Sequence, residues 1–125
     1  MDRNIFLVGL GGLIGSVARY LVAVLFAGQF TSSFPIATFT VNIVGCFIIG
    51  ILFALSDRGN ILSPEWRVFL TTGFCGGFTT FSTFSYESIK LIQDGEFFYL
   101  GLYVALSVVV GFAATYLGII VVRSI

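Results

Sequence analysis

Residues 71–85 bring together, within an apolar chain, side chains and glycines that suit ion binding. They read TTGFCGGFTTFSTFS, in which three glycines within five residues precede phenylalanines interleaved with hydroxyls. Gly73, Gly76 and Gly77 favour an interruption of a helix, which leaves carbonyls unpaired on one side and N–H groups on the other. Such groups persist at membrane depth only where protein or a water-filled site satisfies them. The carbonyls would favour a small cation and the N–H groups an anion.

Three phenylalanines follow the glycines at a helical spacing. Phe78, Phe81 and Phe84 recur every three residues, and positions three apart share a helix face. Because aromatic rings are electropositive at their edges, rings presented edge-on can host a small dehydrated anion. A fixed positive charge would bind that anion too tightly for conduction. The alternative is an aromatic packing stripe, which an isolated F-x-x-F would indicate.

Polar residues interrupt three other apolar segments. Asn42 lies deep in such a segment, and a buried amide is costly unless it is hydrogen-bonded. Asn42 therefore either joins two helices or donates to an anion. Tyr103, Ser107 and Gly111 are spaced by four, which indicates either a hydroxyl-lined pathway or a packing seam.

Arg19 follows a glycine-rich stretch in the first apolar segment. A guanidinium at that depth must pair, bind backbone carbonyls or extend to the membrane surface. A structural role and a role in a water-filled vestibule both stay open. The glycines before it favour close helix packing over chemistry, and they are Gly9, Gly11, Gly12 and Gly15.

These residues lie in segments long enough to cross a bilayer, which needs about 20 apolar residues. Four segments qualify: residues 4–27, 35–55, 65–92 and 97–122. The short connectors require consecutive helices to run antiparallel. Pro35 and Pro64 lie where helices begin, and Ser63 is a candidate N-cap. The sequence thus predicts one all-α membrane domain over residues 1–125, with four transmembrane helices and the third broken mid-membrane.

The composition agrees with this class. Of 125 residues, 58% are hydrophobic and 10% are charged, against about 25% charged in soluble domains. The formal net charge is zero, so no basic surface indicates a nucleic-acid partner. Histidine is absent, and Cys46 and Cys75 are expected to be small buried apolar residues. No nucleophile–base set or phosphate loop is found, which argues against an enzyme.

The charges give only a weak orientation signal. Four helices place both termini on one side, together with four arginines, whereas Lys90 falls toward the other side. The excess favours cytoplasmic termini, and it is small enough to leave room for insertion in both orientations. The arginines of the terminal side are Arg3, Arg58, Arg67 and Arg123.

Residues 73–85 (GFCGGFTTFSTFS), followed by Glu87, resemble the signature of the CrcB/Fluc family of fluoride ion channels. Residues 40–45 (TVNIVG) resemble that family's second-helix motif, and residues 11–20 (GGLIGSVARY) its first-helix motif. The resemblance covers the whole chain, including its length and its four spans.

This resemblance implies a passive, fluoride-selective channel that exports fluoride across the bacterial plasma membrane and lowers its toxicity. Members form antiparallel homodimers with two separate fluoride pathways. A structural sodium ion at the dimer interface would be held by the backbone carbonyls of Gly76 and Thr79. Arg19 and Glu87 would have vestibule or structural roles. The fluoride pathway would be lined by Asn42, Thr80, Phe81, Ser82, Thr83, Phe84, Tyr103 and Ser107.

Two other functions are compatible with a chain of this size. A small proton-coupled drug exporter shares the length, the four spans and the possible dual topology. It needs an intramembrane carboxylate, and the nearest candidate here is Glu87, beyond the broken segment. A non-transporting assembly or scaffold subunit is the second alternative.

Overall fold

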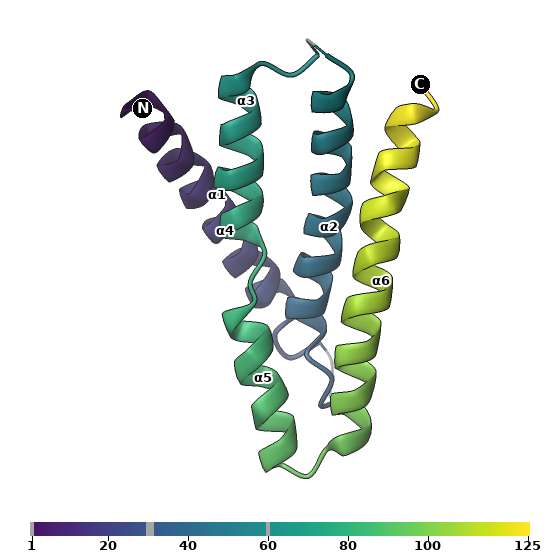
Figure 1. Ribbon diagram of the computed structural model, residues 1–125. Coiled ribbons are helices and arrows are strands. Elements are labelled where there is room, and N and C mark those ends of the chain that lie inside the picture. The colour runs from purple at the N-terminus through teal and green to yellow at the C-terminus, as the bar shows by residue number, and fades with distance from the viewer. Residues whose placement is uncertain (1, 30–31, 60) are drawn as a thin grey trace.

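The computed structural model describes residues 2–29, 32–59 and 61–125, and all the regular elements in these ranges are helical. Two helices lead into a third that is built from several pieces, and a long helix closes the chain (Figure 1). The elements are α1 (Asp2–Phe26), α2 (Ile36–Asp57), α3 (Pro64–Val68), η1 (Phe69–Cys75), α4 (Gly76–Phe78), α5 (Ser82–Gln93) and α6 (Phe97–Arg123).

The helices run alternately up and down, and both termini lie at the same end, as predicted (Figure 1). Helices α1, α2 and α6 have 25, 22 and 27 residues and are apolar enough to cross a membrane. The third predicted span, residues 65–92, consists of α3, η1, α4 and α5. The predicted limits agree with the structure to within two residues at each helix end.

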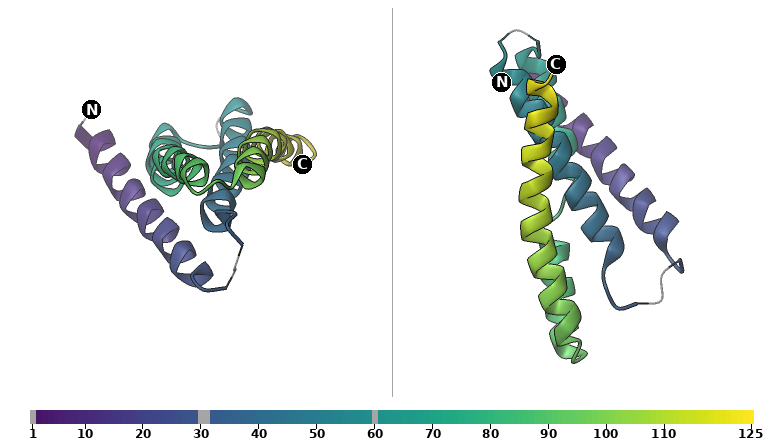
Figure 2. Two further views of the ribbon diagram at one scale, coloured as in Figure 1. Left: turned by 90° about the horizontal axis from the view of Figure 1, so that it is seen from below. Right: turned by 90° about the vertical axis from the view of Figure 1, so that its right-hand side faces the viewer.

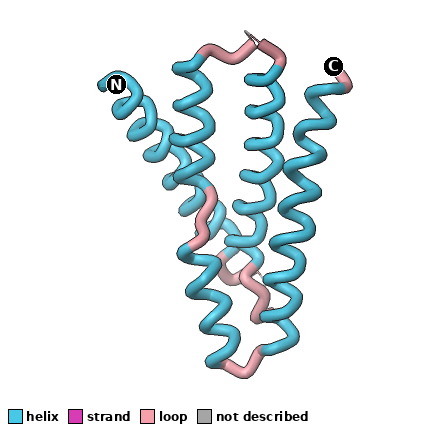
Figure 3. The backbone as a smooth tube through the Cα atoms, viewed as in Figure 1, coloured by secondary structure: helices cyan, strands magenta, loops and turns pink. Residues whose placement is uncertain are grey.

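The third helix is broken, but the break follows the glycines that predicted it (Figure 3). Thr79 has extended backbone angles, φ −91° and ψ 161°, and the helix resumes at Ser82. Gly73 lies within the π-helical segment η1, and Gly76 and Gly77 lie in α4. The prediction of a break was therefore confirmed, whereas its placement at the glycines was wrong.

Close contact with α1 explains two of these glycines. A Cβ on Gly77 would lie 2.6 Å from the carbonyl oxygen of Gly12, and one on Gly73 would lie 3.0 Å from Cα of Gly11. In α1, a Cβ on Gly11 would lie 2.8 Å from the backbone nitrogen of Phe74. Small residues let helix backbones approach in this way. The packing interpretation of the first-helix glycines is thus confirmed, except at Gly9, which has no such neighbour within 4 Å.

Two helix pairs make up the subunit. Helix α1 packs on η1 and α4, whereas α2 packs mainly on α6 (Figure 2). A Cβ on Gly118 of α6 would lie 3.0 Å from the backbone nitrogen of Ile51, so this pair is also closely packed. The buried residues of α1 are Gly11 and Gly15, and large apolar side chains cover the rest of it. That surface suits lipid or a second subunit.

The start of the third helix has the predicted cap. The Ser63 hydroxyl accepts a hydrogen bond from the backbone N–H of Trp66 at 3.3 Å, and Pro64 occupies the first turn. Both cysteines are free thiols, with Cys75 buried and Cys46 half-buried. The sequence did not predict the π-helical segment η1, in which Gly73 contacts α1 and after which α4 leads to the break.

Candidate functional site

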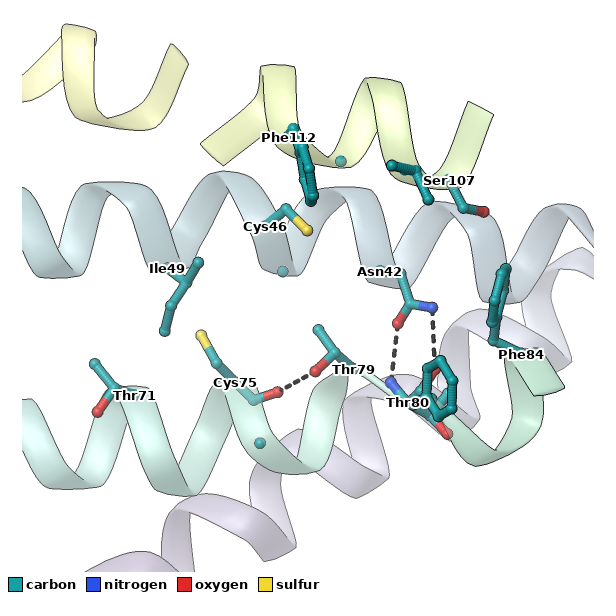
Figure 4. Close-up of a pocket in the computed structure, with 15 residues that line it drawn as sticks. Asn42, Cys46, Ile49, Thr71, Cys75, Thr79, Thr80, Phe84, Ser107 and Phe112 are labelled. Carbon is teal, nitrogen blue, oxygen red and sulfur yellow. Dashed lines mark hydrogen bonds between the residues drawn. The ribbon is translucent and has the colours of Figure 1, made fainter. Parts of the chain in front are cut away.

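Asn42 of α2 binds the backbone at the break in the third helix (Figure 4). Its Nδ2 donates to the Thr80 carbonyl at 3.1 Å, and its Oδ1 accepts from the Thr80 N–H at 2.9 Å. One side chain thus pairs both backbone groups of the residue at the centre of the break. An amide carries two N–H donors, and the Thr80 carbonyl uses one of them. The structure therefore supports the role of Asn42 in joining helices and leaves a donor for a second role.

Arg19 of α1 binds the helix on the other side of the break. Its Nε donates to the Gly77 carbonyl at 3.1 Å, in the last turn before the chain becomes extended. Of the three ways to accommodate an intramembrane guanidinium, the structure shows the bond to a backbone carbonyl. Arg19 also lines a cavity of about 220 Å³, together with Thr83 and Glu87.

The carbonyl groups before the break suit a cation. In an uninterrupted helix the Thr80 N–H would bond the Gly76 carbonyl, but here it donates to Asn42. Among the described residues, no atom of another element would lie within 4 Å of a Cβ added to Gly76, so this face of α4 is open. The Thr83 N–H, which would bond the Thr79 carbonyl in an uninterrupted helix, donates instead to the Thr80 hydroxyl at 3.2 Å, so the Thr79 carbonyl also lacks its helical partner. Backbone carbonyls are suitable ligands for a small hard cation.

The hydroxyl groups after the break are partly engaged in stabilising α5. The Thr80 hydroxyl accepts from the Thr83 N–H at 3.2 Å and lies 3.4 Å from the Ser82 hydroxyl. Thr80 therefore acts as a cap for the second half of the broken helix. Thr83 faces the cavity of Arg19, and Ser82 is exposed, so these hydroxyls do not share one pathway within the subunit.

A cleft of about 520 Å³ lies between α2, α6 and the break (Figure 4). It brings together most of the residues that the sequence singled out. The Ser107 hydroxyl is buried and has no hydrogen-bond partner among the described residues. Because no protein group uses this hydroxyl, it is available to donate to a ligand in the cleft. The predicted residues that line this cleft are Asn42, Gly76, Thr79, Thr80, Phe81, Phe84 and Ser107.

Two of the three phenylalanines share this cleft. The ring centroids of Phe81 and Phe84 lie 5.8 Å apart, with the rings tilted by 40°. Phe78 instead stacks on Phe74 at 5.4 Å and is buried. The prediction that all three share one face was wrong, because the extended backbone at Thr79 interrupts the helical phase between Phe78 and Phe81.

Glu87 is held by hydroxyls from two other helices. Its Oε1 accepts from the Tyr103 hydroxyl at 2.9 Å, and its Oε2 accepts from the Thr38 hydroxyl at 3.0 Å. Tyr103 is fully buried, and its ring lies 4.9 Å from that of Phe84. Tyr103 therefore positions Glu87 and Phe84 and is not among the residues lining the main cleft. The sequence did not assign this role to Thr38, although Thr38 lies four residues before Asn42 on one face of α2.

Comparison with known proteins places the chain in one family over nearly its full length. The family model CrcB-like protein, Camphor Resistance (CrcB), matches residues 6–119. Three similar proteins are each named Fluoride-specific ion channel FluC. The one from Chlorobium luteolum is 54% identical over 96% of this chain and 92% of its own length. The one from Chlorobaculum tepidum is 52% identical over 97% of this chain and 95% of its own length. The one from Flavobacterium psychrophilum is 43% identical over 98% of this chain and 99% of its own length.

These relatives are named as ion channels and not as enzymes, which agrees with the prediction from the sequence. Each match covers at least 96% of this chain, so the matched stretch includes residues 71–85 and the segments that carry Asn42 and Arg19. The chain is a multi-span membrane protein and belongs to the CrcB family.

Proposed function

We propose that this chain is a fluoride-selective, passive channel that exports fluoride from the bacterial cell across the plasma membrane. The observation that carries the proposal is the full-length similarity to proteins named as fluoride-specific ion channels. The geometry of the cleft supports it, because polar donors and aromatic rings converge there at the break in the third helix.

The cleft offers hydrogen-bond donors that the fold has not used. Fluoride is small and strongly hydrated, so a pore must replace its water with other donors. The second N–H of the Asn42 amide and the Ser107 hydroxyl are two such groups. The Thr80 hydroxyl, which lines the cleft, would add a third donor, whereas the Ser82 and Thr83 hydroxyls lie outside the cleft of the isolated subunit.

Phe81 and Phe84 would supply stabilisation without a fixed charge. Ring edges carry partial positive charge, so an anion beside them is attracted but can still leave. Phe81 is 77% exposed in the isolated subunit, which leaves its ring free to meet an ion or a second subunit. Tyr103 would orient the Phe84 ring, which it contacts at 4.9 Å between centroids.

We propose that two copies assemble in antiparallel orientation. Phe81 and Phe112 border the cleft with 77% and 75% of their surfaces exposed, and a second copy would cover them. The weak charge bias is compatible with insertion both ways. The Gly76 and Thr79 carbonyls would hold a structural sodium ion at the interface, where the ion would be coordinated by carbonyl oxygens of both subunits. Arg19 would stabilise the break through its bond to the Gly77 carbonyl, and Glu87 would stabilise the adjoining vestibule through its bond from Tyr103.

Flux measurements on one pair of variants test the pore assignment. Phe81→Ile removes an exposed aromatic ring, so the fold should survive while fluoride release from liposomes falls at least about tenfold, an order-of-magnitude expectation for a lost ion contact. Phe98→Ile is the control, because Phe98 is 75% exposed at the start of α6, outside the cleft. Wild-type flux in Phe81→Ile, or an equal loss in both variants, would contradict the role of Phe81.

A further inference from the structure

A second cavity lies at the end of the subunit where both termini are found. It has a volume of about 350 Å³ and lies between the last turns of α2 and the start of the third helix. Phe53 and Ser56 contribute from α2, and Arg67 contributes from α3. In Figure 1 these helix ends lie side by side at the top of the molecule.

The second cavity adjoins the main cleft. Thr71 of η1 lines both the 520 Å³ cleft and the 350 Å³ cavity. The two spaces therefore follow one another along the third helix, from the end of the subunit to the break at Thr80. An ion moving along this line would meet Arg67 before it met Asn42.

Arg67 is the charged residue among the described residues that line the second cavity. Its Cζ lies 5.3 Å from the centroid of the Phe53 ring, which fixes the guanidinium over the cavity wall. No carboxylate within 4.0 Å pairs with Arg67 in the described part of the chain. The positive charge is therefore not neutralised by a nearby ion pair.

Two of the three hydroxyls that line the second cavity are not free to donate to an anion. The Ser56 hydroxyl donates to the Leu52 carbonyl at 2.9 Å, and the Thr71 hydroxyl donates to the Arg67 carbonyl at 2.7 Å. Each hydroxyl has one proton, and both protons are engaged within their own helices. The donors left for an anion here are the five N–H groups of the guanidinium and the Thr72 hydroxyl, and of these only the guanidinium carries a charge.

We propose that Arg67 forms an anion-recruiting site at the mouth of the ion pathway, where hydrated fluoride gathers before it loses its water. The inference rests on the proposed function and names a residue that acts before the constriction. A fixed charge inside the constriction would trap the ion, whereas one at a hydrated mouth raises the local anion concentration without tight binding. In an antiparallel dimer, one such mouth would open on each face of the membrane.

The ionic-strength dependence of flux separates recruitment from a structural role. Initial fluoride release is measured from liposomes at low fluoride, first at about 10 mM ionic strength and then at about 1 M with an impermeant salt, since the Debye length falls from roughly 30 to 3 Å. Arg67→Gln should lower the rate about two- to fivefold at low ionic strength and match the wild type at high ionic strength. Arg67→Lys should keep the wild-type rate at both.

Arg123→Gln is the matched control, because Arg123 is an exposed arginine at the same end of the subunit but does not line the cavity. It should behave as the wild type. Equal rates for Arg67→Gln and the wild type at low ionic strength would overturn the proposal, as would a loss that is the same at both ionic strengths or is not rescued by lysine. A wild-type protein that releases no fluoride would instead overturn the proposed function.

Discussion

At the residue scale, Asn42 supplies the hydrogen bonds that the interrupted helix would otherwise lack inside the membrane. An extended residue at that depth exposes an N–H and a carbonyl that lipid cannot bond. Asn42 pairs both groups of Thr80 at 2.9 and 3.1 Å. An amide accepts through its oxygen and donates through its nitrogen, so it can bond both groups at once, whereas an ionised aspartate only accepts and a serine has a single oxygen for both bonds.

Removing this amide should therefore destabilise the subunit more than an ordinary interhelical bond would. We expect Asn42→Ala to lower the free energy of unfolding by about 2 kcal/mol, because two backbone groups lose their partners. The average interhelical bond in a membrane protein contributes only about 0.6 kcal/mol. Unfolding in mixed micelles measures the difference.

Ser88→Ala is the control for Asn42→Ala, since the Ser88 hydroxyl makes one bond to the Phe84 carbonyl within its own helix. Its loss should cost much less. Equal stability of the two variants would show that Asn42 does not hold the break.

At the element scale, the broken third helix shows what sequence reasoning could and could not determine. Length and hydropathy predicted the four spans, because a helix that crosses a bilayer must have about 20 residues and be mainly apolar. The glycines predicted a break, but the close approach of α1 is what explains Gly73 and Gly77, with a Gly77 Cβ only 2.6 Å from the Gly12 carbonyl oxygen. Glycine serves both purposes, and only the tertiary contact distinguishes them. Phe78 was assigned to the wrong face because the sequence did not show that the backbone becomes extended at Thr79.

The close approach of α1 to the third helix leads to a paired prediction. Gly11→Ala should destabilise the subunit by about 1–3 kcal/mol, since the added Cβ would lie 2.8 Å from the Phe74 nitrogen, and backbone cannot move as a side chain can. Gly9→Ala, in the same helix, would add a Cβ that has no atom of another helix within 4 Å among the described residues, and it should be neutral or slightly stabilising. Thermal unfolding of both variants measures the difference, and equal stabilities would contradict the packing account.

At the scale of the whole molecule, the isolated subunit leaves the cleft open on one side. Most of the residues that the sequence singled out line this cleft, yet Phe81 and Phe112 remain exposed beside it. The sequence located the members of the site through their unusual chemistry in an apolar chain. It could not show which residues the fold itself uses, such as the Thr80 hydroxyl that caps α5.

Antiparallel assembly predicts a specific labelling result. In a background of Cys46→Ser and Cys75→Ala, Ile125→Cys places one thiol at the exposed C-terminus. An impermeant thiol reagent should label about half of the chains in intact spheroplasts, since the two subunits of the dimer point in opposite directions. Lysis should expose the remainder. Complete labelling, or none before lysis, would show a single orientation.

The most direct measurement is ion release from liposomes that contain the purified protein, followed with a fluoride electrode, with chloride release measured in parallel. The cleft at the helix break, with its unused donors and its phenylalanine pair, predicts rapid fluoride release and little chloride release. Absence of fluoride release from correctly folded protein, or equally rapid release of both ions, would contradict the assignment of a fluoride-selective channel.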